Sequence, residues 1–134
     1  MKKVFIASVL LASLASCDII VVEPRYDYRD RMIGYYDVEE YSQTYNDYTS
    51  YSLHISKEGS SGYTVYLDNF YGANISVYAY VDEGKITIPD QVIDGYEVEG
   101  TGTMQGYNIS LTYRVKDQYH NSRTDFCELW GSRN

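Results

Sequence analysis

The residue best placed to take part in chemistry is Cys17, close to the N-terminus. It ends residues 14–17, Leu-Ala-Ser-Cys, in which a leucine and two small residues precede the cysteine. This pattern matches a bacterial lipobox, where the small residues admit a signal peptidase and the thiol is the nucleophile that receives a diacylglycerol. Upstream, Lys2 and Lys3 precede an apolar stretch that begins at Val4, as in a secretory signal peptide.

This leader predicts a division of the chain into three parts. The apolar stretch is shorter than the about 20 residues that a membrane-spanning helix needs, so we expect cleavage before Cys17. Residues 1–16 are then the signal peptide, residues 17–30 the lipidated cysteine and a tether, and residues 31–134 one small folded domain. Several acyl chains, palmitate among them, would anchor the protein firmly.

The leader also predicts the location of the protein. A lipidated cysteine places it on a membrane of the bacterial cell envelope, and we expect the outer membrane. Asp18, directly after the cysteine, resembles a signal that retains lipoproteins in the inner membrane of some bacteria. The choice of membrane therefore stays open.

Other residue types that support catalysis or metal binding form no recognised arrangement. The two histidines, His54 and His120, have no cysteine or second histidine at a metal-ligand spacing. Neighbouring carboxylates occur at residues 39–40 and at Glu97 and Glu99, where a solvated strand face or loop explains them. We expect no metal, no cofactor and no enzymatic activity.

The charge and the cysteine content of the chain limit the kinds of partner that it is expected to bind. The formal net charge is −8, and removal of the two leader lysines makes the mature chain more negative still. An acidic surface argues against nucleic acid and against docking on anionic headgroups, so attachment would depend on the acyl chains. Cys127 is the other cysteine, and we expect a buried thiol in a monomeric domain.

The mature chain reads as successive β-strands. Apolar and polar residues alternate with period two, which is typical of strands with one buried and one wet face. Turn residues such as Asp94-Gly95 and Pro89-Asp90 separate these runs. The predicted strands cover residues 33–38, 50–56, 63–68, 75–81, 85–88, 96–104, 108–115 and 125–130, and the facing of the last one is ambiguous.

Short connectors favour pairing between consecutive strands. Eight strands paired in order leave two open edges unless the first also pairs with the last, and closure removes those edges. The sequence therefore predicts an all-β fold, a single antiparallel eight-stranded up-and-down barrel, with a β-sandwich as the alternative. An interior of this size is either filled or holds one small ligand.

Four short segments carry a resemblance to a known family. Residues 33–38 (Ile-Gly-Tyr-Tyr-Asp-Val), 68–70, 85–91 and 100–103 (Gly-Thr-Gly-Thr) are similar to segments of the calycin-like, lipocalin-related small lipoproteins of anaerobic gut bacteria. The resemblance covers residues 31–130 and implies an eight-stranded barrel with no assigned activity. Relatives can pair a cysteine near the end of the first strand with one near the C-terminus, but residues 37–41 contain none here.

Tyrosine is unusually abundant, with 17 residues in the chain. Each ring offers an apolar surface and a hydroxyl, which suits recognition, although exposed sheet faces also tolerate tyrosine. The alternation predicts an inner, ligand-binding set that consists of Tyr51, Tyr63, Tyr96 and Tyr113. It also predicts an outer, partner-binding stripe that consists of Tyr66, Tyr78 and Tyr80.

These observations favour a non-catalytic envelope lipoprotein. The expected partners are a membrane, reached through the N-terminal lipid, and a small amphipathic ligand or glycan. The alternative is a protein–protein interaction or inhibitor module of the envelope. An enzyme is the least favoured interpretation, because no constellation of catalytic groups is visible.

Overall fold

The chain forms a closed barrel of antiparallel strands. The computed structural model describes residues 26–60, 62–120 and 123–134, and in this part of the chain each of eight strands pairs with the next. The strands are β1 (Gly34–Ser42), β2 (Asp47–Lys57), β3 (Thr64–Phe70), β4 (Ile75–Asp82), β5 (Lys85–Ile93), β6 (Tyr96–Gln105), β7 (Asn108–Asp117) and β8 (Asp125–Arg133).

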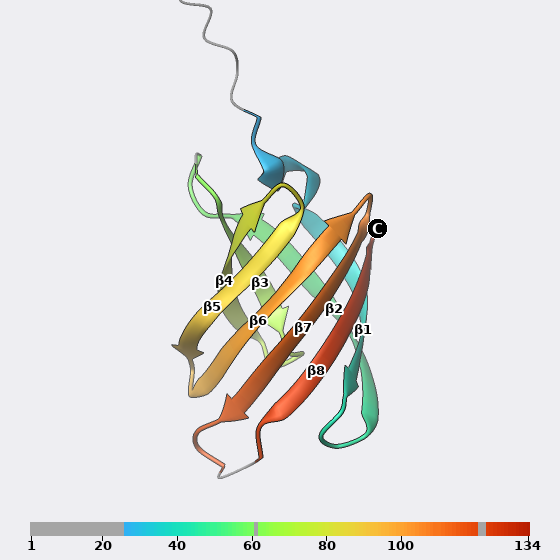
Figure 1. Ribbon diagram of the computed structural model, residues 1–134, viewed down its shortest axis with the longest axis vertical. Coiled ribbons are helices and arrows are strands. Elements are labelled where there is room, and N and C mark those ends of the chain that lie inside the picture. The colour runs from blue at the N-terminus through green and yellow to red at the C-terminus, as the bar shows by residue number, and fades with distance from the viewer. Residues whose placement is uncertain (1–25, 61, 121–122) are drawn as a thin grey trace, which may run out of the picture.

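Pairing of β8 with β1 closes the barrel. The two strands lie side by side (Figure 1). They are antiparallel, and their pairing runs from Tyr36 opposite Arg133 to Ser42 opposite Cys127. The predicted all-β up-and-down barrel is thus confirmed, and the sandwich alternative is wrong.

Alternation along the strands builds the interior. In β4, Ile75, Val77, Ala79 and Val81 are all buried, whereas Ser76 between them is exposed. The other strands contribute inward residues in the same way, and together they form one continuous core. Cys127 belongs to this core with 1% of its surface exposed, which confirms the predicted burial of its thiol.

Two glycines in β6 allow β7 to lie close against it. Gly100 pairs with Tyr113, and Gly102 pairs with Leu111. A Cβ atom on Gly102 would lie 2.1 Å from the carbonyl oxygen of Ser110, and one on Gly100 would lie 2.4 Å from Cβ of Tyr113. Both glycines are therefore required by close packing within the barrel wall.

Strand β5 is longer than the sequence predicted. Pro89 and Asp90 do not form a turn but lie inside β5, at an irregularity in its pairing with β6. Regular pairing with β4 ends at Thr87, and beyond it the side chain of Gln91 substitutes for the missing ladder. Its amide accepts a hydrogen bond from the Tyr78 nitrogen at 3.1 Å and donates one to the Tyr78 oxygen at 2.9 Å. This replacement explains how a proline can occupy the strand.

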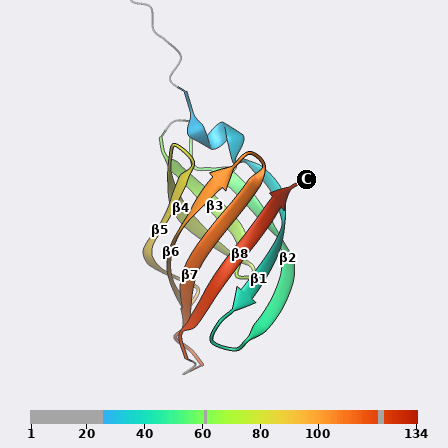
Figure 2. The ribbon, with the colours of Figure 1, turned by 45° about the vertical axis from the view of Figure 1, so that its right-hand side comes forward.

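A short 3₁₀ helix, η1 (Tyr28–Arg31), covers one end of the barrel (Figure 2). Arg29 is 1% exposed and donates to the carbonyl oxygens of Glu58 at 2.7 Å and Thr64 at 3.0 Å. Its guanidinium also holds the pKa of the Asp27 carboxyl well below its usual range. The folded part therefore begins within the segment that was predicted as tether.

None of the helical segments in the described part of the chain has the length and apolar character that crossing a bilayer would require. The predicted signal peptide, Cys17 and most of the predicted tether lie outside the described residues.

Candidate functional site

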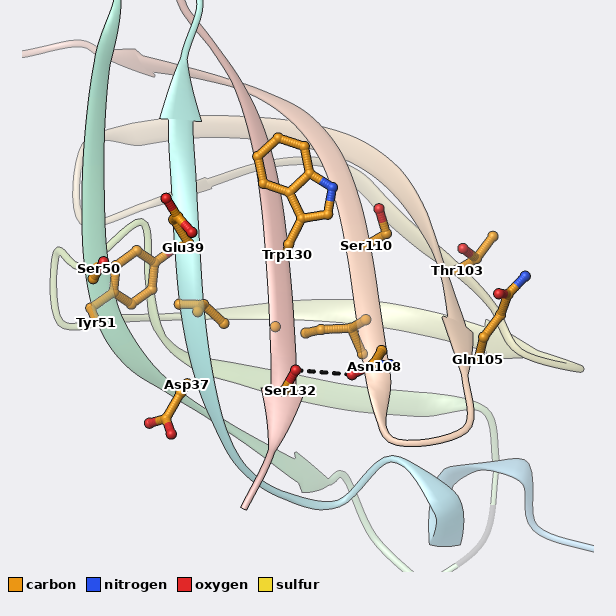
Figure 3. Close-up of a pocket in the computed structure, with 13 residues that line it drawn as sticks. Asp37, Glu39, Ser50, Tyr51, Thr103, Gln105, Asn108, Ser110, Trp130 and Ser132 are labelled. Carbon is orange, nitrogen blue, oxygen red and sulfur yellow. Dashed lines mark hydrogen bonds between the residues drawn. The ribbon is translucent and has the colours of Figure 1, made fainter.

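The largest hollow described in the structure is a groove on the outer wall of the barrel. It has a volume of about 1100 Å³ and crosses strands β2, β1, β8, β7 and β6 (Figure 3). A hollow farther along the same wall has about 360 Å³, and a pit beside η1 has about 350 Å³. We refer to the largest one as the Trp130 groove.

Strand pairing arranges the side chains of the Trp130 groove in two parallel rows. The residues of each row lie opposite one another on successive strands. The first row consists of Ser50, Glu39, Trp130, Ser110 and Thr103, and the second consists of Asp37, Ser132, Asn108 and Gln105. All nine side chains are exposed. Because neighbouring strands lie about 4.8 Å apart, five strands give a surface about 19 Å wide.

Trp130 lies in the middle of the first row. It is 46% exposed and is flanked by Glu39 on β1 and by Ser110 on β7. Its indole therefore presents an apolar ring surface and one N–H donor between groups that accept hydrogen bonds. In the second row, the Ser132 hydroxyl donates to the Asn108 amide oxygen at 2.9 Å (Figure 3).

The groove is acidic. Asp37 and Glu39 are the charged residues among those that line it, and no lysine or arginine belongs to this lining. Both carboxylates lie on β1, two residues apart, so they point away from the barrel on the same side of the groove. Apart from the indole N–H of Trp130, the remaining polar side-chain groups are hydroxyls and amides, which both donate and accept hydrogen bonds.

Inside the barrel, the predicted inner tyrosines are only partly brought together. Tyr113 is buried, and Tyr51 and Tyr96 are half-buried against the core. The placement of Tyr63 was wrong: it is 65% exposed and precedes β3, so it does not share the inner face. Tyr71, which was not predicted, takes its place, with its ring centroid 6.5 Å from that of Tyr113 and 6.2 Å from that of Tyr96.

These inner tyrosines meet two buried carboxylates. The Tyr51 hydroxyl donates to Glu40 at 3.0 Å, and the Tyr71 hydroxyl donates to Asp125. Ser42 also donates to Asp125. Burial raises the pKa of Glu40 to about 7 and also raises the pKa of the Cys127 thiol. The sequence had suggested a solvated position for Glu40, which is wrong because Glu40 faces the interior and is 4% exposed.

This cluster fills the end of the barrel that lies away from η1. Glu40 and Asp125 are almost inaccessible to solvent. Glu40 accepts hydrogen bonds from Tyr51 and Thr49, and Asp125 accepts them from Ser42 and Tyr71. The Tyr113 hydroxyl is buried and has no hydrogen-bond partner among the described residues. Core and cluster together pack the interior with side chains, so the more accessible binding surface is the outer wall.

The predicted outer stripe exists as a surface. Tyr66 lies opposite Tyr78 on neighbouring strands, and the rings of Tyr78 and Tyr80 meet edge to face at 6.0 Å. Together with Glu58 and Thr64 they line a depression of about 210 Å³. This depression is much smaller than the Trp130 groove.

The two histidines lie on the surface. His54 stacks on Tyr35 with ring centroids 4.3 Å apart and has Asp68 at 3.2 Å. His120 has Asp117 at 2.8 Å. Within residues 26–60, 62–120 and 123–134, no three histidine, cysteine or carboxylate groups converge as metal ligands.

The Trp130 groove was missed by sequence reasoning. The residues of its two rows come from five strands, and no strand contributes more than two of them. The available signal was the alternation of Trp130 with Leu129 and Gly131, combined with closure of the barrel, which places β8 between β1 and β7.

Comparison with known proteins supports the fold. The chain matches none of the protein-family models, and none of the curated proteins matches it. Among solved structures, it is similar to a redesigned β-barrel, with a TM-score of 0.57 and 12% sequence identity. The match covers 84% of this chain and 99% of the redesigned barrel. At this identity the likeness concerns the fold alone.

Proposed function

We propose that this protein is a non-catalytic, lipid-anchored component of the bacterial cell envelope that binds a neutral glycan in the Trp130 groove. The observation that carries the proposal is the position of one exposed indole at the centre of a row of hydroxyl and carboxylate groups. The anchor is supported by the lipobox at residues 14–17. The resemblance to calycin-like lipoproteins agrees with the lipid anchor and implies no particular ligand.

The chemistry of the groove suits a sugar chain. A sugar ring has apolar C–H faces that can pack on the flat indole, and a rim of hydroxyls that donate to carboxylates and exchange hydrogen bonds with serine, threonine and amide groups. A surface about 19 Å wide accommodates several linked rings. Because Asp37 and Glu39 lack a basic counterpart in the lining, a glycan with carboxylate or sulfate groups would be repelled.

The same geometry favours binding over hydrolysis. Glycoside hydrolysis needs two carboxyl groups on opposite sides of the bond that breaks. Asp37 and Glu39 are neighbours on one strand and one side of the groove, and the other two clustered carboxylates, Glu40 and Asp125, are buried. A recognition role therefore agrees better with these positions than a catalytic one.

The experiment uses the fluorescence of Trp130, which is the single tryptophan of the chain. Neutral tetrasaccharides of glucose, mannose and N-acetylglucosamine are titrated into the protein, with a tetramer of galacturonic acid as the anionic comparison. We expect a shift in Trp130 emission with at least one neutral sugar and none with the anionic one. An aromatic anchor contributes about 2 kcal/mol or more, so Trp130→Ala should weaken binding, measured by calorimetry, at least about thirtyfold.

Phe126→Ala is the matched control. Phe126 lies four residues earlier on β8, is 52% exposed and does not line the groove. We expect it to bind the sugar like the wild type. Binding that survives Trp130→Ala, or the absence of binding to every neutral tetrasaccharide, would refute the proposal.

A further inference from the structure

The end of the barrel that η1 covers differs in composition from the rest of the surface. The chain enters the folded domain here, because η1 lies at this end and the predicted lipid attachment site precedes it in the sequence (Figure 1). The same end contains the β6–β7 turn and the last residues of β8. A lipid on Cys17 would therefore connect to the barrel at this end.

A connected band of aromatic and basic side chains follows this end. The Arg31 guanidinium lies 5.2 Å from the centroid of the Tyr26 ring, and that of Arg133 lies 4.5 Å from the centroid of Tyr107. Arg133 joins the two pairs by donating to the carbonyl oxygen of Arg31 at 2.8 Å. Ile33, whose carbonyl oxygen Arg133 also contacts, completes the band. We call these five residues the η1 rim.

The rim exposes apolar surface that packing does not use. Tyr26 is 54% exposed, Tyr107 is 66% exposed and Ile33 is 39% exposed. Tyrosine rings are enriched where a membrane meets water, because the ring is apolar and its hydroxyl remains hydrated. Arginine behaves similarly, since its stem can lie along apolar groups while the guanidinium contacts headgroups.

Charge is divided between the two parts of the barrel. At the η1 end, the helix with its flanks and the adjoining turns contain equal numbers of basic and acidic side chains. The basic ones are Arg29, Arg31, Lys57, Lys85 and Arg133. The acidic ones are Asp27, Asp30, Glu58, Asp82 and Glu83. The remaining described residues contribute only Arg114, Lys116 and Arg123 as basic groups against a large excess of carboxylates.

The net acidity of the chain therefore lies on the wall and on the end away from η1. An anionic bilayer repels that part of the barrel and leaves the η1 end free to approach. The negative charge of the whole chain argued against contact with anionic headgroups, but the η1 end does not share that negative charge.

We propose that the η1 rim is a membrane-docking surface that rests in the interface of the bilayer to which the protein is anchored. The proposal depends on the lipid anchor of the proposed function but not on glycan binding. It fixes the orientation of the barrel: the η1 end faces the lipid and the Glu40–Asp125 end faces away. The nearer row of the Trp130 groove then lies beside the membrane, because Asn108 follows Tyr107 and Ser132 precedes Arg133.

The test places one tryptophan at either end of the full-length lipidated protein. Trp130→Phe removes the native fluorophore, and Tyr107→Trp or Tyr119→Trp adds a new one. Tyr119 is 78% exposed and lies in the β7–β8 loop at the other end, so it is the matched control. The proteins are reconstituted in vesicles of phosphatidylcholine and phosphatidylglycerol with brominated acyl chains, which quench tryptophan within the bilayer.

We expect quenching at position 107 to exceed that at position 119 at least about threefold. Equal quenching at both positions, or none at position 107, would overturn the docking proposal. Flotation of the vesicles distinguishes failure of the lipid anchor from failure of the docking proposal. Protein that does not float with the lipid refutes the anchor and the docking together, whereas protein that floats without quenching at position 107 refutes the docking alone.

Discussion

The Tyr51 hydroxyl donates a hydrogen bond to Oε1 of Glu40 across 3.0 Å, inside the barrel and between neighbouring strands. The pKa of Glu40 is raised to about 7, chiefly by burial and in smaller part by the nearby Asp125, while the hydrogen bonds from Tyr51 and Thr49 act in the opposite direction. Glu40 thus takes up a proton in the folded state at a pH where it would be ionised in the unfolded chain.

The first prediction is that stability falls as the pH rises. The pKa of Glu40 is higher in the folded state than in the unfolded chain, so the folded state binds more protons between pH 4.5 and about 7. Glu40 therefore contributes stability that is fully present below this window and is lost across it, by about 3 kcal/mol in the free energy of unfolding. Urea denaturation at pH 5 and pH 8 measures the difference.

Substitution shows whether Glu40, and not another carboxylate, causes this pH dependence of stability. Glu40→Gln keeps an acceptor for Tyr51 but cannot ionise, so this part of the pH dependence should disappear and the variant should be more stable than the wild type at pH 8. Glu39→Gln, one residue away and exposed, is the control and should leave the dependence unchanged. An unchanged slope in Glu40→Gln would show that Glu40 is not the titrating group.

The second prediction concerns the close contact between β6 and β7. Gly102→Ala should destabilise the domain by about 2 kcal/mol or more, because the new methyl group meets the Ser110 carbonyl oxygen and the backbone cannot move aside. Thr101→Ala, at the exposed neighbouring position, should change stability by less than about 0.5 kcal/mol. Thermal or urea denaturation of both variants provides the comparison, and similar stabilities would contradict this role of Gly102.

The third prediction tests the outer stripe as a partner surface. Replacement of Tyr66, Tyr78 and Tyr80 with serine should weaken any protein interaction through this face, since aromatic anchors dominate interfaces. Tyr66 and Tyr78 are half-buried, so we expect a cost of about 1 kcal/mol in stability. Affinity capture from envelope extracts compares wild type and triple variant. The same bound proteins in both samples would exclude the stripe as the contact surface.

The fourth prediction concerns Cys17. Cys17→Ala should abolish incorporation of labelled fatty acid and should leave an uncleaved or soluble product, because no thiol remains to receive the lipid. Detergent partitioning of cells that produce each form measures the change. A variant that still partitions like the wild type would refute the lipid anchor.

The strand pattern could be predicted because side-chain alternation is a local property. In β4 and β7 a single period of two identifies both the strand and its inward face. Pro89 misled the prediction for a physical reason. Proline usually ends a strand, but the side chain of Gln91 provides hydrogen bonds that the β4–β5 ladder lacks. No local pattern contains that information.

The candidate sites depend on contacts between distant segments. Glu39 and Glu40 look identical in sequence, yet one lies in the Trp130 groove and the other in the buried cluster, because the register of β1 decides which side chain faces inward. Trp130 gains its neighbours only when β8 pairs with both β1 and β7. Tyr63 was misplaced because the strand begins one residue later than its alternation suggested.

Closure of the barrel by β1 and β8 also brings the two chain ends of the folded domain together. The Asn134 nitrogen donates to the Tyr35 carbonyl oxygen at 3.0 Å, so the last residue lies beside the start of the first strand. Every strand then has two neighbours, and the same strand pairs would form if the chain began and ended between any other two neighbouring strands. A circular permutant, joined across this seam and opened between β7 and β8, where residues 118–120 are exposed, would retain every pair of strands.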